Sequence, residues 1–191
     1  MTTIIKFFSI LASKIRWMGW ASPFWFVYKP RDWKLTGKQL SEIMCILDTG
    51  DLLITRVDSF ISTWLIPGWW NHAGVCVTIN SRNLDERIIH AIGKGVMNSH
   101  ILDFLRADHA VILRPKCGED ARRAVGIAKD LEGGGYDFDY DFSDPSKLTC
   151  TELAALCYEA IEPKKTWLGE IVKADDIVAL DSFRIIWDSR K

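Results

Sequence analysis

The sequence predicts a single domain of the α+β class, and three features support that class. Its 191 residues are 48% apolar, which is enough to bury a sizeable core. Runs typical of strands and stretches typical of helices are segregated along the chain. The sequence also contains no internal repeat and no low-complexity segment. We therefore expect a small antiparallel sheet, open or closed into a barrel, with helices packed against it.

The first predicted elements are a helix, a strand and a second helix. A helix is expected over residues 38–47, and Gly50-Asp51 then turns the chain into a strand over residues 52–56. Residues 57–66 carry apolar side chains at positions i, i+3, i+4, i+7 and i+8, which is the spacing of a helical face. Pro67-Gly68 ends this second helix.

The middle of the chain supplies most of the predicted sheet. Three runs rich in β-branched residues are expected to be strands: residues 73–79, 87–92 and 110–114. A group of Asn, Ser and Arg residues gives turn chemistry between the first two strands. Residues 119–132 then carry an apolar helical stripe, and the three glycines that follow are typical of a helix C-terminus.

The last part of the chain mixes aromatic, acidic and helical segments. Residues 136–144 alternate aromatic with polar or acidic side chains, which is typical of a half-buried edge strand. A helix is expected over residues 150–161. The segments 177–180 and 183–187 could form one or two final strands.

Composition excludes several classes of function. The formal net charge is −1 and basic residues are scattered, which gives no electrostatic basis for binding nucleic acid. The five cysteines are odd in number and form no CxxC pair, so we expect reduced thiols, no disulfide framework and no zinc site. No G-x-S-x-G elbow and no phosphate loop is present. We therefore expect neither a metal nor a cofactor.

The N-terminal region is unusually rich in aromatic residues. Residues 1–28 contain eight aromatic side chains, of which four are tryptophan or tyrosine and four are phenylalanine. Three basic residues lie in the same segment. The uncharged stretch 17–28 covers about half of the roughly 20 residues that a membrane-spanning helix needs, and no signal-peptide cleavage site follows. Residues 1–28 therefore either lie in a membrane interface or pack on the domain as a strap. We expect a cytoplasmic or membrane-peripheral protein, with residues 1–40 as an extension and residues 41–191 as the domain.

Cys150 has the sequence context of a nucleophile. Thr149 and Glu152 have the spacing of a capping box, which places Cys150 at the first position of a helix. Backbone N–H groups and the positive end of the helix dipole then point at the sulfur. Both favour the thiolate, so we expect a lowered thiol pKa and nucleophilic chemistry at Cys150. Its helical neighbour Cys157 is expected to be a small core residue.

A nucleophilic cysteine also needs an imidazole base and a group that orients it. Only four histidines are present; His72 directly precedes one predicted strand, and His90 lies in the next one. Antiparallel pairing could bring these two rings onto one face of the sheet, although a slip of one residue would separate them. The aromatic and acidic segment that leads to Cys150 could form one wall of the same cleft.

These residues resemble those of a known family. The segments 50–54, 70–75 and 88–96, followed by 136–140, 148–153 and 174–177, are similar to the YiiX-like branch of NlpC-type cysteine hydrolases. That branch is a circularly permuted papain fold and is related to the lecithin:retinol acyltransferase group. The resemblance covers about residues 48–187 and implies the permuted order in which the histidines precede the cysteine. Residues 1–40 lie outside its pattern.

The resemblance implies a role for each residue of the site. Cys150 would be the nucleophile, His72 the general base, and His90 the third member of the triad. YiiX-like proteins often have glutamate at this third position, and an imidazole there stabilises the His72 cation less than a carboxylate would. Thr151 stands where serine is expected. We also expect substrate contacts from residues that flank the triad, namely Trp70, Asn71, Tyr136, Tyr140 and Thr151.

Together these features predict a cysteine hydrolase that cleaves an amide, as in peptides of the cell-wall type, or an ester, through an acyl-enzyme. One alternative is a thiol acyltransferase or phospholipase that acts on lipid acyl groups, which the tryptophans near His72 favour. Another alternative is a non-catalytic protein that binds at membrane interfaces. The expected partners are therefore a peptide or lipid acyl substrate and a membrane surface contacted through residues 1–28.

Overall fold

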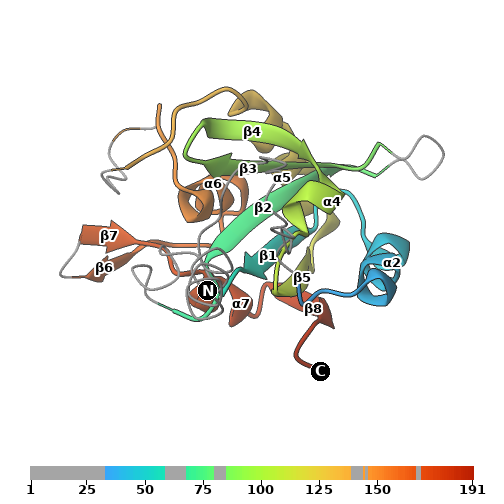
Figure 1. The fold of residues 1–191 in the computed structure, drawn as a ribbon. Helices are drawn as coiled ribbons and strands as arrows, with labels where there is room; N and C mark the ends of the chain where they lie inside the picture. Colours follow the sequence, from blue (N-terminus) through green and yellow to red (C-terminus); the bar gives the residue numbers. More distant parts are fainter. Residues whose placement is uncertain (1–32, 59–67, 80–84, 139–143, 145, 167–168) are drawn as a thin grey trace, which may run out of the picture. The chain divides into compact units, whose positions relative to one another are not determined.

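The computed structural model describes residues 33–58, 68–79, 85–138, 144, 146–166 and 169–191. Its centre is one antiparallel six-stranded sheet (Figure 1). In spatial order the strands are β4 (Gly95–His100), β3 (Arg87–Ile92), β2 (His72–Thr78), β1 (Leu52–Arg56), β5 (His109–Pro115) and β8 (Phe183–Asp188). The sheet ends in two different strands, β4 and β8, so it is open. The predicted α+β class and antiparallel sheet are confirmed, and the barrel alternative is wrong.

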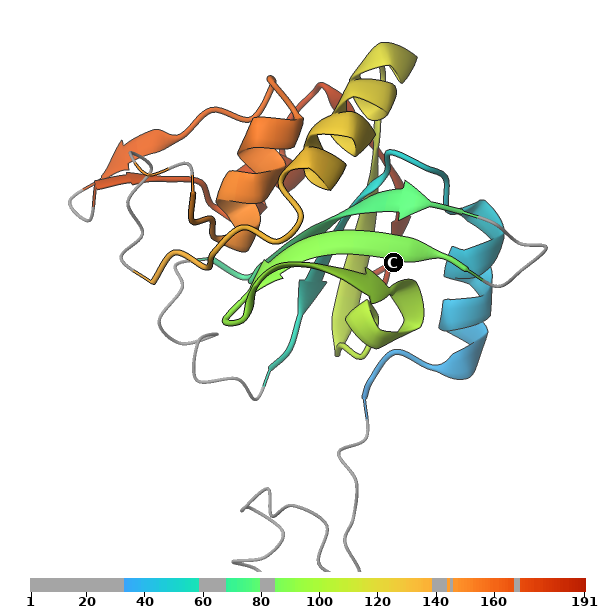
Figure 2. The same ribbon diagram turned by 90° about the horizontal axis from the view of Figure 1, so that it is seen from above.

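Helices cover both faces of the sheet (Figure 2). On one face, Leu52 and Ile54 of β1 pack in a core with α5 (Gly118–Asp130), α6 (Cys150–Cys157) and α7 (Ala174–Val178). On the other face, Leu53 packs in a second core with α2 (Gly37–Ile46) and α4 (Ile101–Phe104). Side chains alternate between the faces of a strand, so the consecutive apolar residues Leu52, Leu53 and Ile54 of β1 contribute to both cores.

The structure confirms the helix expected over residues 38–47 with a shift of one residue. Thr36 caps α2 by accepting a hydrogen bond from the backbone of Gln39, whose side chain in turn accepts one from the Thr36 backbone. This helix extends across residue 40, where the sequence analysis placed the domain boundary. The compact unit that the structure describes runs from Trp33 to Lys191.

Other predictions concern residues that the structure does not describe. The aromatic extension falls on residues 1–32 and most of the helix expected over residues 57–66 falls on residues 59–67, so both stay predictions. Within the described ranges, no helix combines the length and the apolar character required to cross a membrane.

The strands predicted at residues 52–56, 73–79, 87–92, 110–114 and 183–187 correspond to β1, β2, β3, β5 and β8. Four other elements were missed: strand β4, the short helix α4, and the two strands of a hairpin, β6 (Lys164–Thr166) and β7 (Gly169–Ile171). Strand β4 follows a tight turn at which Gly95 adopts a φ of 109°, a conformation suited to glycine.

Two predicted strands are wrong in the described part of the chain. Residues 177–180 are expected to be extended, but Ala174–Val178 is helical, with Asp175 and Asp176 in its positively polarised first turn. The described part of residues 136–148 forms no named strand, and a single bridge joins Gly135 to Lys147. Close backbone contacts of Gly133 and Gly134 with Val96 direct this segment along the edge of β4.

Candidate active site

Cys150 is the first residue of α6, as the sequence predicts. The Thr149 side chain accepts a hydrogen bond from the Glu152 N–H, and the Glu152 carboxylate accepts one from the Thr149 N–H. This capping box holds the first turn of α6 against β2 and β3, where Cys150 is 7% exposed. The backbone N–H groups of Ala73, Cys150 and Thr151 lie near the Cys150 sulfur and favour its charged form.

The contact with Ala73 places the sulfur beside the backbone that carries His72. Pairing between β2 and β3 begins at Val75 and Ile89, so Ala73 lies beyond the paired part of β2. The Ala73 N–H instead lies near the sulfur and acts to lower the pKa of the thiol. The N-terminus of α6 therefore meets the sheet at Ala73, where β2 is no longer paired with β3. Ala73 directly follows His72 in the chain.

The protonation state of Cys150 differs from the one expected from its helix position. Burial raises the pKa of the Cys150 thiol to about 11, although the backbone N–H groups near the sulfur act in the opposite direction. The buried carboxylate of Glu152 adds to the rise. A buried charge loses its hydration, and here this cost exceeds the gain from the helix terminus. The expectation of a lowered thiol pKa is therefore wrong for the protein without substrate.

His72 and His90 are brought together, as predicted. The Nε2 atom of His72 lies 2.8 Å from the Nδ1 atom of His90, and the ring centroids are 5.1 Å apart. The Nε2 atom of His90 in turn lies 2.9 Å from the hydroxyl oxygen of Ser99. The three side chains thus form one hydrogen-bonded row, with the Nδ1 atom of His72 at its free end.

Both imidazoles are held in their neutral form. Burial and, to a smaller extent, the nearby His90 together lower the pKa of His72 to about 3. Burial also lowers the pKa of His90 to about 4. A neutral His72 has a lone pair with which it can accept a proton, which is what a general base requires.

Phe104 of α4 contacts both rings. Its ring centroid lies 5.1 Å from that of His72 and 5.3 Å from that of His90. Sequence reasoning missed Phe104 and Ser99 because it missed α4 and β4, which carry them. The two apolar residues Val96 and Met97 directly after a glycine turn are the signal that could have identified the second strand of this hairpin.

The segment before His72 is fixed by Asp175 of α7. One carboxylate oxygen of Asp175 accepts hydrogen bonds from the backbone N–H groups of Trp69 and Trp70, at 2.8 Å and 3.1 Å. Gly68 approaches the same oxygen and has a φ of 122°. Asn71 continues the chain with an N–H bond to the Thr55 carbonyl. Asp175 therefore holds the entry to β2 through two successive backbone groups.

The residues predicted to contact substrate have different environments. Trp70 is 1% exposed and packs in the core, and Asn71 is also buried. Thr151 and Tyr136 are half-buried, and the Tyr136 ring contacts Phe138 at a centroid distance of 4.8 Å. Tyr140 lies outside the described residues. Their contacts with substrate stay predictions, and burial gives Trp70 a packing role in this structure.

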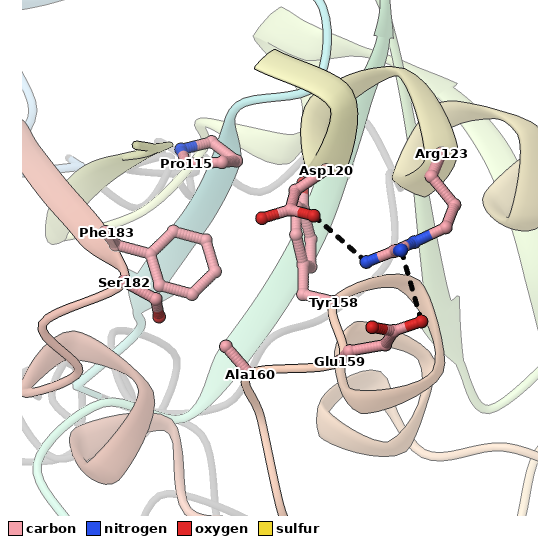
Figure 3. A pocket seen from close by; sticks show the side chains of 8 residues that line it. All are labelled: Pro115, Asp120, Arg123, Tyr158, Glu159, Ala160, Ser182 and Phe183. Atoms are coloured by element: carbon pink, nitrogen blue, oxygen red, sulfur yellow. Dashed lines mark hydrogen bonds and ion pairs between the residues drawn. The ribbon is translucent and has the colours of Figure 1, made fainter. Parts of the chain in front are cut away.

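A hollow of about 320 Å³ lies at the opposite end of α6 (Figure 3). Arg123 pairs there with Asp120 at 3.0 Å and with Glu159 at 3.1 Å, so its charge is already matched. Because α6 has eight residues, its two ends are separated by about 12 Å. This hollow is therefore separate from the Cys150 site.

Comparison with known proteins bears on the family and the fold of the chain. A family model described as "permuted papain-like amidase enzyme, YaeF/YiiX, C92 family" matches residues 46–185. Among solved structures, the chain is similar to the crystal structure of metalloprotein yiiX from Escherichia coli O157:H7, with a TM-score of 0.60 and 17% sequence identity. The alignment covers 74% of this chain and 97% of that one. At this identity the likeness shows the fold alone. No curated protein matches the chain.

The description of that relative as a metalloprotein concerns that protein. In the described part of this chain, no group of three or more His, Cys, Asp or Glu side chains is arranged to hold a metal ion. The residues described therefore do not fit a metal site.

Proposed function

Since the chain belongs to the permuted papain-like amidase family, a family of cysteine hydrolases, we propose that it hydrolyses an amide bond through Cys150, His72 and His90. One observation carries the proposal. The backbone N–H of Ala73 lies near the Cys150 sulfur, and the residue before Ala73 is a histidine whose ring is bonded to a second histidine. This arrangement supplies a nucleophile, a base and an orienting group on adjacent elements.

In the first half of the reaction, the Nδ1 atom of His72 takes the proton of the Cys150 thiol. The sulfur then attacks the carbonyl carbon of the substrate, and the carbonyl electron pair moves onto oxygen. The Cys150 N–H, at the start of α6, is a donor for this oxyanion. When the carbon–nitrogen bond breaks, the amine leaves with the proton held by His72, and a thioester on Cys150 remains.

In the second half of the reaction, water attacks the thioester. His72 takes one proton from this water and returns it to the sulfur as the carbon–sulfur bond breaks. The products are a carboxylic acid and the free thiol. His90 keeps its hydrogen bond to the Nε2 atom of His72 throughout, so the ring neither rotates nor loses its orientation.

The resting protonation states support general-base catalysis. The pKa of Cys150 is raised to about 11 and that of His72 is lowered to about 3. Both shifts favour the neutral thiol and imidazole over a thiolate–imidazolium pair at neutral pH. Proton transfer is therefore expected to accompany attack on the bound substrate.

The experiment that tests the proposal uses 4-nitrophenyl acetate as an acylating probe. We expect a burst of one nitrophenolate per chain and a mass gain of one acetyl group on Cys150. Cys150→Ala should abolish the burst, and His72→Ala should slow it strongly. Cys45 and Cys117 are exposed thiols, so Cys45→Ala and Cys117→Ala are matched controls that should retain the burst. Acetylation that persists in Cys150→Ala would contradict the proposal.

A second candidate function is hydrolysis or transfer of a lipid acyl group by the same residues. Phe138 favours it, because its side chain is 70% exposed and lies beside the β3–β4 turn near Gly93. An exposed aromatic ring at that position could contact an apolar chain. Comparing acylation by nitrophenyl esters of short and long fatty acids tests it. A rate that rises with chain length and falls in Phe138→Ser favours the lipid, whereas equal rates favour the amide.

A further inference from the structure

We propose that Ser99 is a positioning residue of this site: its hydroxyl accepts a hydrogen bond from the Nε2–H group of His90 and so fixes the tautomers of both imidazoles. The proposal rests on the proposed function, because it concerns how His72 is prepared to take the proton of Cys150. It adds Ser99, as a positioning residue, to the three proposed active-site residues, and it assigns a role to strand β4.

The geometry of the β3–β4 hairpin places Ser99 at this position. His90 of β3 is paired with Met97 of β4. Ser99 lies two residues beyond Met97, so its side chain is on the same face as that of His90, diagonally across the two strands. The Ser99 hydroxyl oxygen lies 2.9 Å from the Nε2 atom of His90. Ser99 is half-buried in this position.

The row of hydrogen bonds can be arranged in two ways. In the productive arrangement, His90 donates from Nε2 to Ser99 and accepts at Nδ1 from the Nε2–H of His72. The Nδ1 atom of His72 then carries a lone pair and can receive the thiol proton. In the reverse arrangement, Ser99 donates to His90, and the Nδ1 atom of His72 carries a hydrogen that blocks its action as a base.

One of these two arrangements must be selected because the third residue of the proposed triad, His90, is an imidazole. A carboxylate only accepts hydrogen bonds, so it would always select the Nε2–H form of its partner histidine. Neutral His90 both donates and accepts, and therefore transmits whichever arrangement its far side receives. Phe104 packs on both rings but has no polar atom with which to select a tautomer. Ser99 is the side chain bonded to the Nε2 atom of His90, the ring nitrogen that does not contact His72.

The productive arrangement has a second source of stability. It places the hydrogen on Nε2 in both rings, which is the tautomer that neutral histidine prefers in water. The reverse arrangement requires the less favoured Nδ1–H form in both rings. An accepting Ser99 therefore agrees with the intrinsic preference of His72 and of His90, and removal of the hydroxyl removes the partner that anchors the row.

The decisive measurement is the nitrogen NMR spectrum of the full chain labelled at histidine, recorded at neutral pH. We expect bare Nδ1 and protonated Nε2 atoms for both His72 and His90. A protonated Nδ1 on either ring in the unaltered chain would overturn the proposal, and this result needs no variant to fold. The readout is also independent of catalysis, so it can fail while the hydrolase reaction stands.

Variants of Ser99 supply the kinetic part of the test. In Ser99→Ala we expect mixed tautomers and acylation by 4-nitrophenyl acetate that is about 10- to 100-fold slower, as for partners that orient metal-binding histidines. Ser99→Thr keeps a hydroxyl in a strand and should restore both readouts. Asn98→Ala, on the opposite face of β4, is the matched control and should change neither.

The outcomes separate this proposal from the proposed function. If Ser99→Ala leaves the tautomers and the rate unchanged while Cys150→Ala abolishes acylation, then the role of Ser99 is wrong and the hydrolase stands. If Cys150→Ala itself retains acylation, the proposed function fails. Loss of rate in Ser99→Ala with unchanged tautomers would also overturn the proposal, because that result indicates a purely structural effect.

Discussion

Removal of the Asp175 carboxylate is expected to destabilise the protein and to misplace His72. Asp175 accepts hydrogen bonds from two successive backbone N–H groups, those of Trp69 and Trp70. These groups directly precede Asn71 and His72. In Asp175→Ala both N–H groups lose a charged acceptor, and the chain entering β2 loses its link to α7.

The magnitude follows from the number and type of the bonds. A hydrogen bond to a charged group contributes about 1.5–3 kcal/mol net, and a neutral one about 0.5–1.5 kcal/mol. Asp175 is half-buried, so solvent screening places its bonds at the lower end of the charged range. Asp175→Ala should therefore lower the free energy of unfolding by about 3 kcal/mol. Asp175→Asn keeps one accepting oxygen and should lower it by about 1–2 kcal/mol.

Gly68 provides an independent check on the same contact. A Cβ atom at Gly68 would lie 2.2 Å from the Asp175 oxygen, and its φ of 122° is itself unfavourable for alanine. Gly68→Ala should therefore destabilise the protein. In the Asp175→Ala background the clash is absent, so Gly68→Ala should cost less there. This difference is the interaction free energy of a double-mutant cycle.

Urea unfolding followed by tryptophan fluorescence measures these free energies, and acylation by 4-nitrophenyl acetate reports on His72 in the folded variants. Asp181→Asn, an exposed carboxylate after α7, is the control and should change neither quantity. The reasoning is refuted if Asp175→Ala and Asp175→Asn are as stable and as active as the Asp181→Asn control.

Three further predictions follow from the protonation states and from the core. Burial raises the pKa of Cys150 to about 11, so alkylation of Cys150 by iodoacetamide should accelerate about tenfold per pH unit from pH 7 to 9. A rate that has already reached a plateau near pH 7 would instead show a preformed thiolate. The pKa values of His72 and His90 are lowered from 6.5 to about 3 and about 4, so below pH 6.5 the unfolded chain binds more protons and the free energy of unfolding should fall as the pH falls towards 4. His90→Gln should flatten this slope in urea unfolding, and an unchanged slope would contradict the assignment. Leu153 is fully buried in α6, so Leu153→Ala should lower the free energy of unfolding by about 2–5 kcal/mol. Leu156 is 45% exposed on the same helix, so Leu156→Ala should lower it by less than about 0.5 kcal/mol. Equal losses of stability in thermal unfolding would contradict the described packing.

The sequence identified those parts of the site that have a local signal. The capping box at Thr149 and Glu152 depends on four consecutive residues, and the structure forms it at the predicted place. His72 and His90 were identified because each lies in an apolar run that was recognised as a strand. Their hydrogen bond, by contrast, depends on the register of β2 and β3, which begins at Val75 and Ile89 and follows from packing on both faces of the sheet.

Contacts between segments distant in the sequence had no local signal. Asp175 is separated by about a hundred residues from the backbone that it fixes, and nothing in the residues around either group indicates the pairing. Phe104 and Ser99 lie on elements that were missed, because a four-residue helix and a strand after a glycine turn give weak periodicity. Similarly, residues 177–180 have the apolar content of a strand, but Ile177 and Val178 form the end of α7, and Ile177 is buried in the core.

By itself, the sequence determined the α+β class, the start of the Cys150 helix and the two histidines, because caps, apolar periodicity and residue type are local properties. Only the tertiary structure decided that the sheet is open, that the two imidazoles bond to each other and to Ser99, and that the Cys150 thiol is protonated at rest. The last point shows the physical reason. The helix terminus acts locally and lowers the pKa of the sulfur, but the burial that raises it to about 11 comes from the packing of α6 against the sheet.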